Sequence, residues 1–145
     1  MEIEEKLRIL KSLDTKNLIE RIDKFESELE KAMTAEADFK NSNYQFLASS
    51  TSDCQEVKRI IAELAIKTPE TNKSGKKMIV AEKDAWLLRQ RTENKELAEA
   101  IAKQRQVTFL LADKQIEVEM ARRRLEGNRA VLALKTQQIA FLASS

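Results

Sequence analysis

The sequence predicts an all-α protein, a long antiparallel helical hairpin or coiled-coil bundle with a short N-terminal helix. Among 145 residues there are only 2 Gly and 1 Pro, against average usage of roughly 7% and 5%. Charged residues reach 34% and aromatic residues only 5%, and strong helix formers dominate. The hydrophobic fraction of 42% recurs at helical spacing, which argues against disorder. We expect one elongated domain over residues 1–145.

The first predicted helix is short and covers about residues 2–12. The apolar register slips after it, so its stripe does not continue into the next helix. Asp14 or Thr15 is placed to cap a second helix that begins near Lys16, because both residue types accept hydrogen bonds from free N–H groups at a helix start.

The second predicted helix covers residues 16–48 and carries a heptad pattern. Positions separated alternately by four and three residues form a seam, the pattern of a coiled coil. Two seam members, Glu36 and Asn43, are polar, and they either set register and partner number or mark a local imperfection. The seam consists of Leu18, Ile22, Phe25, Leu29, Ala32, Glu36, Phe39, Asn43 and Phe46.

A serine-rich segment over residues 49–53 favours a break, although a continuous helix is the alternative. Serine hydroxyls compete for backbone groups and therefore suit helix ends better than helix interiors. Asp53 and Glu56 have capping-box spacing, as do Ser52 and Gln55. We expect a third helix over about residues 53–67.

The strongest turn signal is the segment 68–76, which holds Pro69 and Gly75. Proline disfavours helix at the residue before it, and the neighbouring Asn, Ser and Gly favour a loop. This loop is the predicted hairpin tip. One helix is then expected over residues 77–143, since Gly127 costs only about 1 kcal/mol against Ala and does not end a helix.

The last helix carries apolar residues on two opposite sides. The first stripe repeats every seven residues, with Gln104 as its polar member. At roughly 100° per residue the second stripe lies about 160–200° around the helix. The first stripe is Leu97, Gln104, Leu111, Val118, Leu125, Leu132 and Ile139. The second is Phe109, Ala112, Ile116, Met120, Gly127, Ala130, Leu134 and Phe141.

A helix that is apolar on two faces needs cover on both. One arm of a hairpin covers one face, so the other requires a second chain, a helical protein partner, or the N-terminal helices folded over it as a closed monomeric bundle. We expect a homo-oligomer, with a dimer favoured, and a non-enzymatic structural or adaptor role. The residues expected to mediate self-association are Leu111, Val118, Leu125, Leu132, Ile139, Ile116, Met120 and Leu134.

Composition argues against catalysis and metal binding. The chain has no His and a single cysteine, Cys54, which removes the commonest general base and any thiolate cluster within one chain. No nucleophile or phosphate-loop motif is present, so we expect neither an enzyme nor a cofactor. The acidic start and the short apolar runs predict no signal peptide and no membrane span, hence a cytoplasmic protein.

Two basic clusters support an alternative function as a nucleic-acid-binding accessory protein. Residues 1–50 carry 8 basic and 11 acidic side chains, whereas the rest of the chain is net basic. A basic hairpin tip and an arginine run could bind phosphates, although solvated helix faces commonly look the same. The candidate contacts are Lys73, Lys76, Lys77, Arg122, Arg123 and Arg124.

The second arm resembles a known group of proteins. The string Ala-Glu-Lys-Asp-Ala-Trp-Leu at 81–87, followed by the charged helix through Arg-Ala-Val-Leu-Ala-Leu at 129–134, resembles small uncharacterised helical proteins of tailed phages and prophages. The resemblance covers roughly residues 78–143 and contains no diagnostic motif. It implies a helical fold and no site residue.

Overall fold

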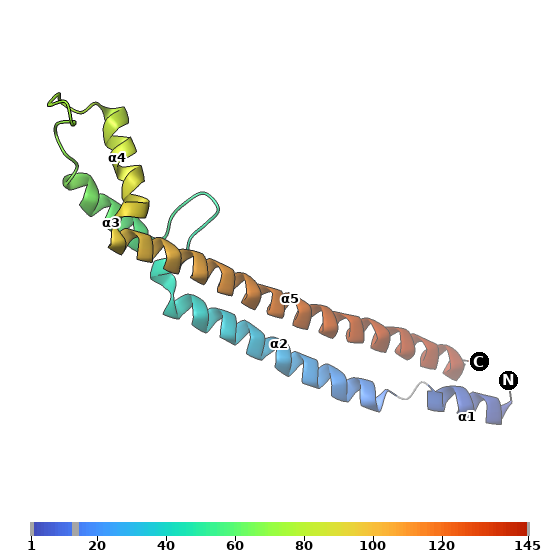
Figure 1. The fold of residues 1–145 in the computed structure, drawn as a ribbon. Helices are drawn as coiled ribbons and strands as arrows, with labels where there is room; N and C mark the ends of the chain where they lie inside the picture. Colours follow the sequence, from blue (N-terminus) through green and yellow to red (C-terminus); the bar gives the residue numbers. More distant parts are fainter. Residues whose placement is uncertain (1, 13–14, 145) are drawn as a thin grey trace. The chain divides into compact units, whose positions relative to one another are not determined.

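The computed structural model describes residues 2–12 and 15–144, and over these residues the protein is all-α, as predicted (Figure 1). An isolated bridge joins Thr71 and Lys77, and no strand forms within the described residues. The helices are α1 (Ile3–Ser12), α2 (Lys16–Ser42), the 3-10 helix η1 (Tyr44–Phe46), α3 (Gln55–Ile66), α4 (Val80–Glu93) and α5 (Lys95–Ser144).

Residue contacts divide the chain into two compact units. The terminal unit contains Met1–Ala37 and Lys114–Ser145, and the central unit contains Asp38–Asp113. Helices α2 and α5 each contribute residues to both units. The expectation of one elongated domain stays a prediction, and each unit is described by itself.

The terminal unit is an antiparallel pair made by the first part of α2 and the second part of α5 (Figure 1). Leu18, Ile22 and Leu125 form its buried centre, and Phe25, Leu29 and Leu132 pack against them. Arg129 Nη2 donates to Glu26 Oε1 at 2.7 Å beside this core. An exposed pair of this kind contributes only about 0–1 kcal/mol, so apolar packing provides most of the stability.

The heptad seam predicted over residues 16–48 is buried or half-buried at every position, although its last two members, Asn43 and Phe46, lie beyond the end of α2. The helix starts at Lys16 as expected, and the carbonyl of Thr15 accepts from the N–H of Ile19 at 2.8 Å. Asp14, the other predicted cap, lies outside the described residues. The α5 side of the seam also alternates by three and four residues, because Ala121, Asn128 and Leu142 are buried or half-buried between the positions of the first stripe.

The core of the central unit is formed by α3 and the start of α5. Its fully buried side chains come from both helices, and Phe46, Trp86 and Leu87 pack against their edge. Val57, Ile60 and Leu64 share one face of α3 through their helical spacing. The buried members of this cluster are Cys54, Val57, Ile60, Leu64, Leu97, Ala100 and Ile101.

Helix α2 ends at Ser42, six residues before the predicted end at 48. The side-chain amide of Asn43 and its backbone N–H both donate to the carbonyl of Phe39, at 3.0 and 3.1 Å. The backbone bond is the last helical one of α2, and the side-chain bond places a second donor on the same carbonyl. After Asn43 the chain passes through η1 into a loop. The segment 49–53 is therefore a break and not a continuous helix.

The loop between α3 and α4 lies where the sequence predicts it and is slightly longer than 68–76. The side chain of Asn72 accepts from the N–H groups of Ser74 and Lys76 at 3.0 and 3.1 Å. Gly75 adopts a φ of 80°, a left-handed conformation that glycine reaches without a Cβ clash. Met78 is buried at the end of the loop.

The predicted continuous helix over 77–143 is wrong at Asn94. This residue has an extended ψ of 117°, and it separates α4 from α5. Its Oδ1 accepts from the N–H of Leu97 at 3.0 Å, and its backbone N–H donates to Gln90 at 2.9 Å. Asn94 thus ends one helix and caps the next, which breaks the chain without Gly or Pro.

We predict that Asn94→Ala destabilises the protein by about 1 kcal/mol, because the first turn of α5 loses its side-chain cap. Urea unfolding followed by circular dichroism measures this change. Thr92→Ala is the matched control, since the Thr92 hydroxyl is exposed and only donates to the carbonyl of Arg89. Equal unfolding midpoints for both variants would contradict a capping role for Asn94.

Candidate functional site

The first apolar stripe of α5 faces the interior. Leu97, Val118 and Leu125 are buried, whereas Gln104, Leu111, Leu132 and Ile139 are half-buried. Leu125 and Leu132 pack within the chain against α2. Since these two side chains already have partners in the same chain, they are not free for a second one.

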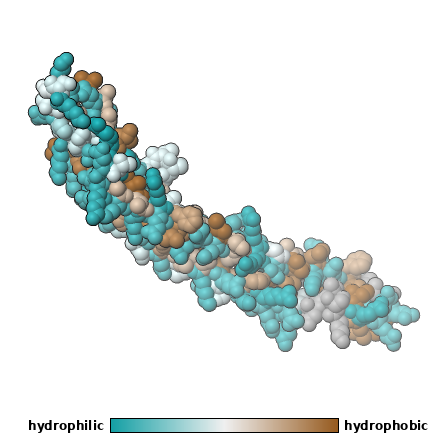
Figure 2. Space-filling view, in the orientation of Figure 1, coloured by the Kyte–Doolittle hydropathy of each residue, from teal (hydrophilic) through white to brown (hydrophobic). Residues whose placement is uncertain are grey.

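The second stripe is exposed along its whole length. Its large side chains in the terminal unit keep much of their surface in solvent, with exposed fractions of 56% for Ile116, 49% for Met120, 56% for Leu134 and 71% for Phe141. Apolar residues are also visible among polar ones in the space-filling view (Figure 2). We name this face, defined by Ile116, Met120, Ala130, Leu134 and Phe141, the outer stripe.

Gly127 lies on the same face as the outer stripe and is exposed. A Cβ added at this position would meet no atom within 4 Å in the described chain. Packing within the chain therefore does not require glycine here, although a glycine inside a helix costs about 1 kcal/mol against Ala. Its presence leaves the backbone of α5 open to close approach from outside.

A polar cluster in the central unit connects the loop before α3 to α4 and α5. Asp53 accepts from Arg91 Nη2 at 2.7 Å and from Gln104 Nε2 at 3.2 Å. Gln104 Oε1 in turn accepts from the backbone N–H of Cys54 at 2.7 Å. Gln104, the polar member of the first stripe, thus binds the start of α3, and Asp53 does not act as the cap that the capping-box spacing predicts.

Cys54 is the N-cap of α3 in place of Asp53 or Ser52. Its Sγ accepts from the N–H of Val57 at 3.5 Å, and the residue is fully buried. The hydrogen bond from Arg91 lowers the pKa of Asp53 below its usual value, with a smaller contribution from Gln104, while burial opposes this change. The Asp53 carboxylate therefore binds groups of its own chain, Arg91 and Gln104.

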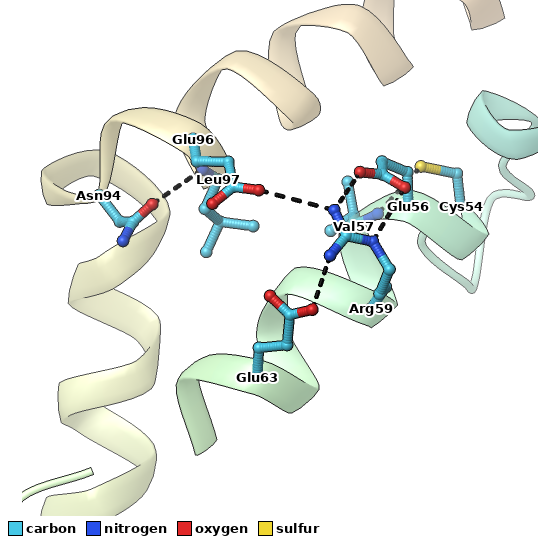
Figure 3. Close-up of polar contacts among 8 residues, drawn as sticks. All are labelled: Cys54, Glu56, Val57, Arg59, Glu63, Asn94, Glu96 and Leu97. Atoms are coloured by element: carbon cyan, nitrogen blue, oxygen red, sulfur yellow. Dashed lines mark hydrogen bonds and ion pairs between the residues drawn. The ribbon is translucent and has the colours of Figure 1, made fainter. Parts of the chain in front are cut away.

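A second ionic cluster lies at the surface of the central unit and is centred on Arg59 (Figure 3). Arg59 binds Glu56 and Glu63 on its own helix and approaches Glu96 Oε1 on α5 at 3.5 Å. The hydrogen bond to Glu56 raises the pKa of Arg59, and the same contact lowers the pKa of Glu56. Because Arg59, Glu63 and Glu96 are solvent-exposed, the cluster contributes little to stability.

The predicted nucleic-acid contacts lie in separate units. Lys73, Lys76 and Lys77 are exposed in the loop of the central unit. In the terminal unit, Glu119 pairs with Arg122 at 3.6 Å and with Arg123 at 3.0 Å, which reduces the positive charge of the arginine run. The alternative of nucleic-acid binding stays a prediction.

The central unit also has an open hollow of about 770 Å³ between the loop and α4. Pro69, Met78 and Trp86 line it together with the exposed Leu88. The charged side chains of its lining are Lys73, Glu82 and Arg89. Within the described residues, no three His, Cys, Asp or Glu side chains are grouped to hold a metal ion. Among the helices of the described part of the chain, none has an apolar stretch that could span a bilayer.

We predict that Gln104→Leu destabilises the protein by about 1–3 kcal/mol, although the change completes an apolar stripe. It leaves the Cys54 N–H without an acceptor and removes one donor from Asp53, and such part-buried groups are costly to leave unpaired. Denaturant unfolding measures the loss. Gln106→Leu, at an exposed position of the same helix, is the control. A Gln104→Leu variant as stable as the parent would show that the cluster contributes little.

We further predict that Asp53 makes stability fall at acidic pH. Its pKa in the folded state lies below the usual 3.8, so the ionised form is favoured by folding. The stabilisation is complete above pH 3.8 and is lost as pH falls through the lower folded-state pKa. Asp53→Asn should therefore be less stable than the parent at pH 7, and the difference should shrink below about pH 4. Asp84→Asn, an exposed carboxylate on α4, is the control. A difference that stayed constant down to pH 2 would rule out this linkage.

Comparisons with known proteins yield no neighbour for this chain. No family model, no curated protein and no solved structure matches it.

Proposed function

We propose that this chain is a non-enzymatic structural or adaptor protein that self-associates through the outer stripe of α5. The observation that carries the proposal is the exposure of Ile116, Leu134 and Phe141 on a helix whose opposite face is already covered by α2. In a monomer, both faces of α5 would be covered only if another part of the same chain packed on the outer stripe. The side chains of this stripe remain exposed.

The energetic reason for association is the apolar area that stays in water. Fully burying a Leu, Ile or Phe side chain is worth roughly 1.5–3 kcal/mol relative to leaving it exposed. Single apolar residues scattered over a protein surface are common, but several of them on one helix face form a patch that is typical of an interaction site. A second helix laid along the stripe would bury them together, as in a helical bundle.

The position of the stripe suits an assembly role because association leaves the folded pair intact. Leu125 and Leu132 keep their contacts with α2, while the outer stripe, on the opposite face of the same helix, binds a second chain. A protein with this arrangement can join chains through a rigid helix without local unfolding. Protomers linked in this way act as a scaffold or adaptor.

We predict that the parent has a concentration-dependent mass above 16.6 kDa, and that Leu134→Glu and Ile116→Glu weaken association at least tenfold. A charge placed in the interface must be desolvated, which costs more than 1.4 kcal/mol, or one factor of ten. Sedimentation equilibrium measures the mass, and circular dichroism checks that helicity is kept.

The matched control is Gln115→Glu, which adds the same charge at an exposed position of α5 away from the outer stripe. It should associate like the parent. A parent that stays monomeric at high concentration would refute self-association, and equal weakening by Gln115→Glu would place the interface elsewhere.

A further inference from the structure

We infer that the outer stripe binds the outer stripe of a second copy in antiparallel orientation, with the twofold axis at the level of residue 125. This inference rests on the proposed self-association and specifies its partner and register. The surface concerned lies entirely in the terminal unit, on the α5 residues between 116 and 134.

The spacing of this face is the same when read in either direction. Between residues 116 and 134 the outer stripe, together with Arg123 and Gly127 on the same face, has exposed positions separated by four, three, four, three and four residues. They are Ile116, Met120, Arg123, Gly127, Ala130 and Leu134. An antiparallel second copy centred on residue 125 therefore places every position opposite another position of the same face, as a twofold interface requires.

The side chains that meet in this register are complementary in size. Ile116 lies opposite Leu134 of the second copy, so large apolar groups bury each other at both ends. Met120 lies opposite Ala130, and Arg123 lies opposite Gly127. The open space around Gly127 then receives the aliphatic part of the arginine side chain, which can cover apolar surface while its charge stays near water.

Charge at the centre also favours this register. Glu126 is next to Gly127 and exposed, so the guanidinium of Arg123 from the second copy comes within reach of its carboxylate. The twofold symmetry of the dimer produces this Arg123–Glu126 pair twice. The two copies of Glu126 approach each other on this edge, and the two copies of Arg124 do so on the other edge. Each exposed like-charge pair costs a few tenths of a kcal/mol, which the two attractive Arg123–Glu126 pairs offset.

Other arrangements of the same stripe are less favourable. A parallel pair in register would place Arg123 against Arg123 and Gly127 against Gly127 at the centre. An antiparallel pair shifted by one heptad would place Leu134 against Arg123 and Met120 against Gln137. The parallel pair opposes like charges at the centre of the face, and the shifted pair leaves large apolar side chains against polar ones. In the register at residue 125, each apolar side chain of the face lies opposite another apolar side chain.

Distance measurements between spin labels test this register. Nitroxides are attached to Gln115→Cys in one sample and Thr136→Cys in another, because both positions are exposed and lie away from the outer stripe. In the proposed dimer both label pairs should be separated by roughly 30 Å along the axis, at about 1.5 Å per residue. The parent treated with the same reagent is the control, since its only cysteine, Cys54, is fully buried.

The other outcomes overturn the inference in distinguishable ways. Short distances at both positions would show a parallel pair. A heptad shift would lengthen one distance and shorten the other by about 10 Å. A dimeric mass without dipolar coupling would show that another face mediates assembly, whereas a monomer would refute the proposed function as well.

Charge exchange provides a second test. Arg123→Glu and Glu126→Arg should each weaken dimerisation roughly tenfold, because two exposed pairs per dimer turn from attractive to repulsive. The double variant should recover most of the parent affinity. Arg122→Glu is the control, since Arg122 shares Glu119 with Arg123 but points away from the outer stripe. Failure of the double variant to recover would overturn the predicted Arg123–Glu126 contact.

Discussion

The apolar seam between α2 and α5 is the interaction on which the terminal unit depends. Leu18, Ile22 and Leu125 are buried there, and this burial orients α5 around its own axis. Once the seam has formed, the rotation of α5 is no longer free, so the positions on its far side must face solvent. The exposure of the outer stripe is therefore a consequence of core packing and not an independent feature.

In the central unit, the loop before α3 is connected to α3, α4 and α5 by an apolar cluster and a polar cluster. The apolar cluster provides the buried surface, whereas the polar cluster of Asp53, Arg91 and Gln104 orients the helices. Arg91 belongs to α4 and Gln104 to α5, while Asp53 precedes α3. A carboxylate that binds two helices at once defines their relative positions, and its lowered pKa reports this role.

Periodicity alone was sufficient to predict the helical class and the α2 seam, because these depend on residue type at regular spacing. It did not show which stripe of α5 packs within the chain, since Leu125 and Leu132 were expected to mediate self-association and instead pack against α2. It failed where one side chain outweighs propensity. Asn94 breaks the second arm by capping α5, and α2 ends just before Asn43, whose side chain binds the carbonyl of Phe39. Both are asparagines within helix-favouring sequence. The Asp53 cluster was missed because its partners are 38 and 51 residues away, and the polar Gln104 within an apolar stripe was its one signal.

The two helices of the terminal unit differ in their outer faces, and this difference limits how chains can associate. The positions of α2 that point away from the seam, such as Glu20, Asp23 and Lys31, are charged and exposed, so stacking two α2 surfaces would require the desolvation of many charges. The outer positions of α5 are mostly apolar or small. In the proposed dimer the two α5 helices consequently occupy the middle, with one α2 on each outer side. Because the twofold contact uses the same face of both copies, it closes on itself and covers both outer stripes between residues 116 and 134 at once.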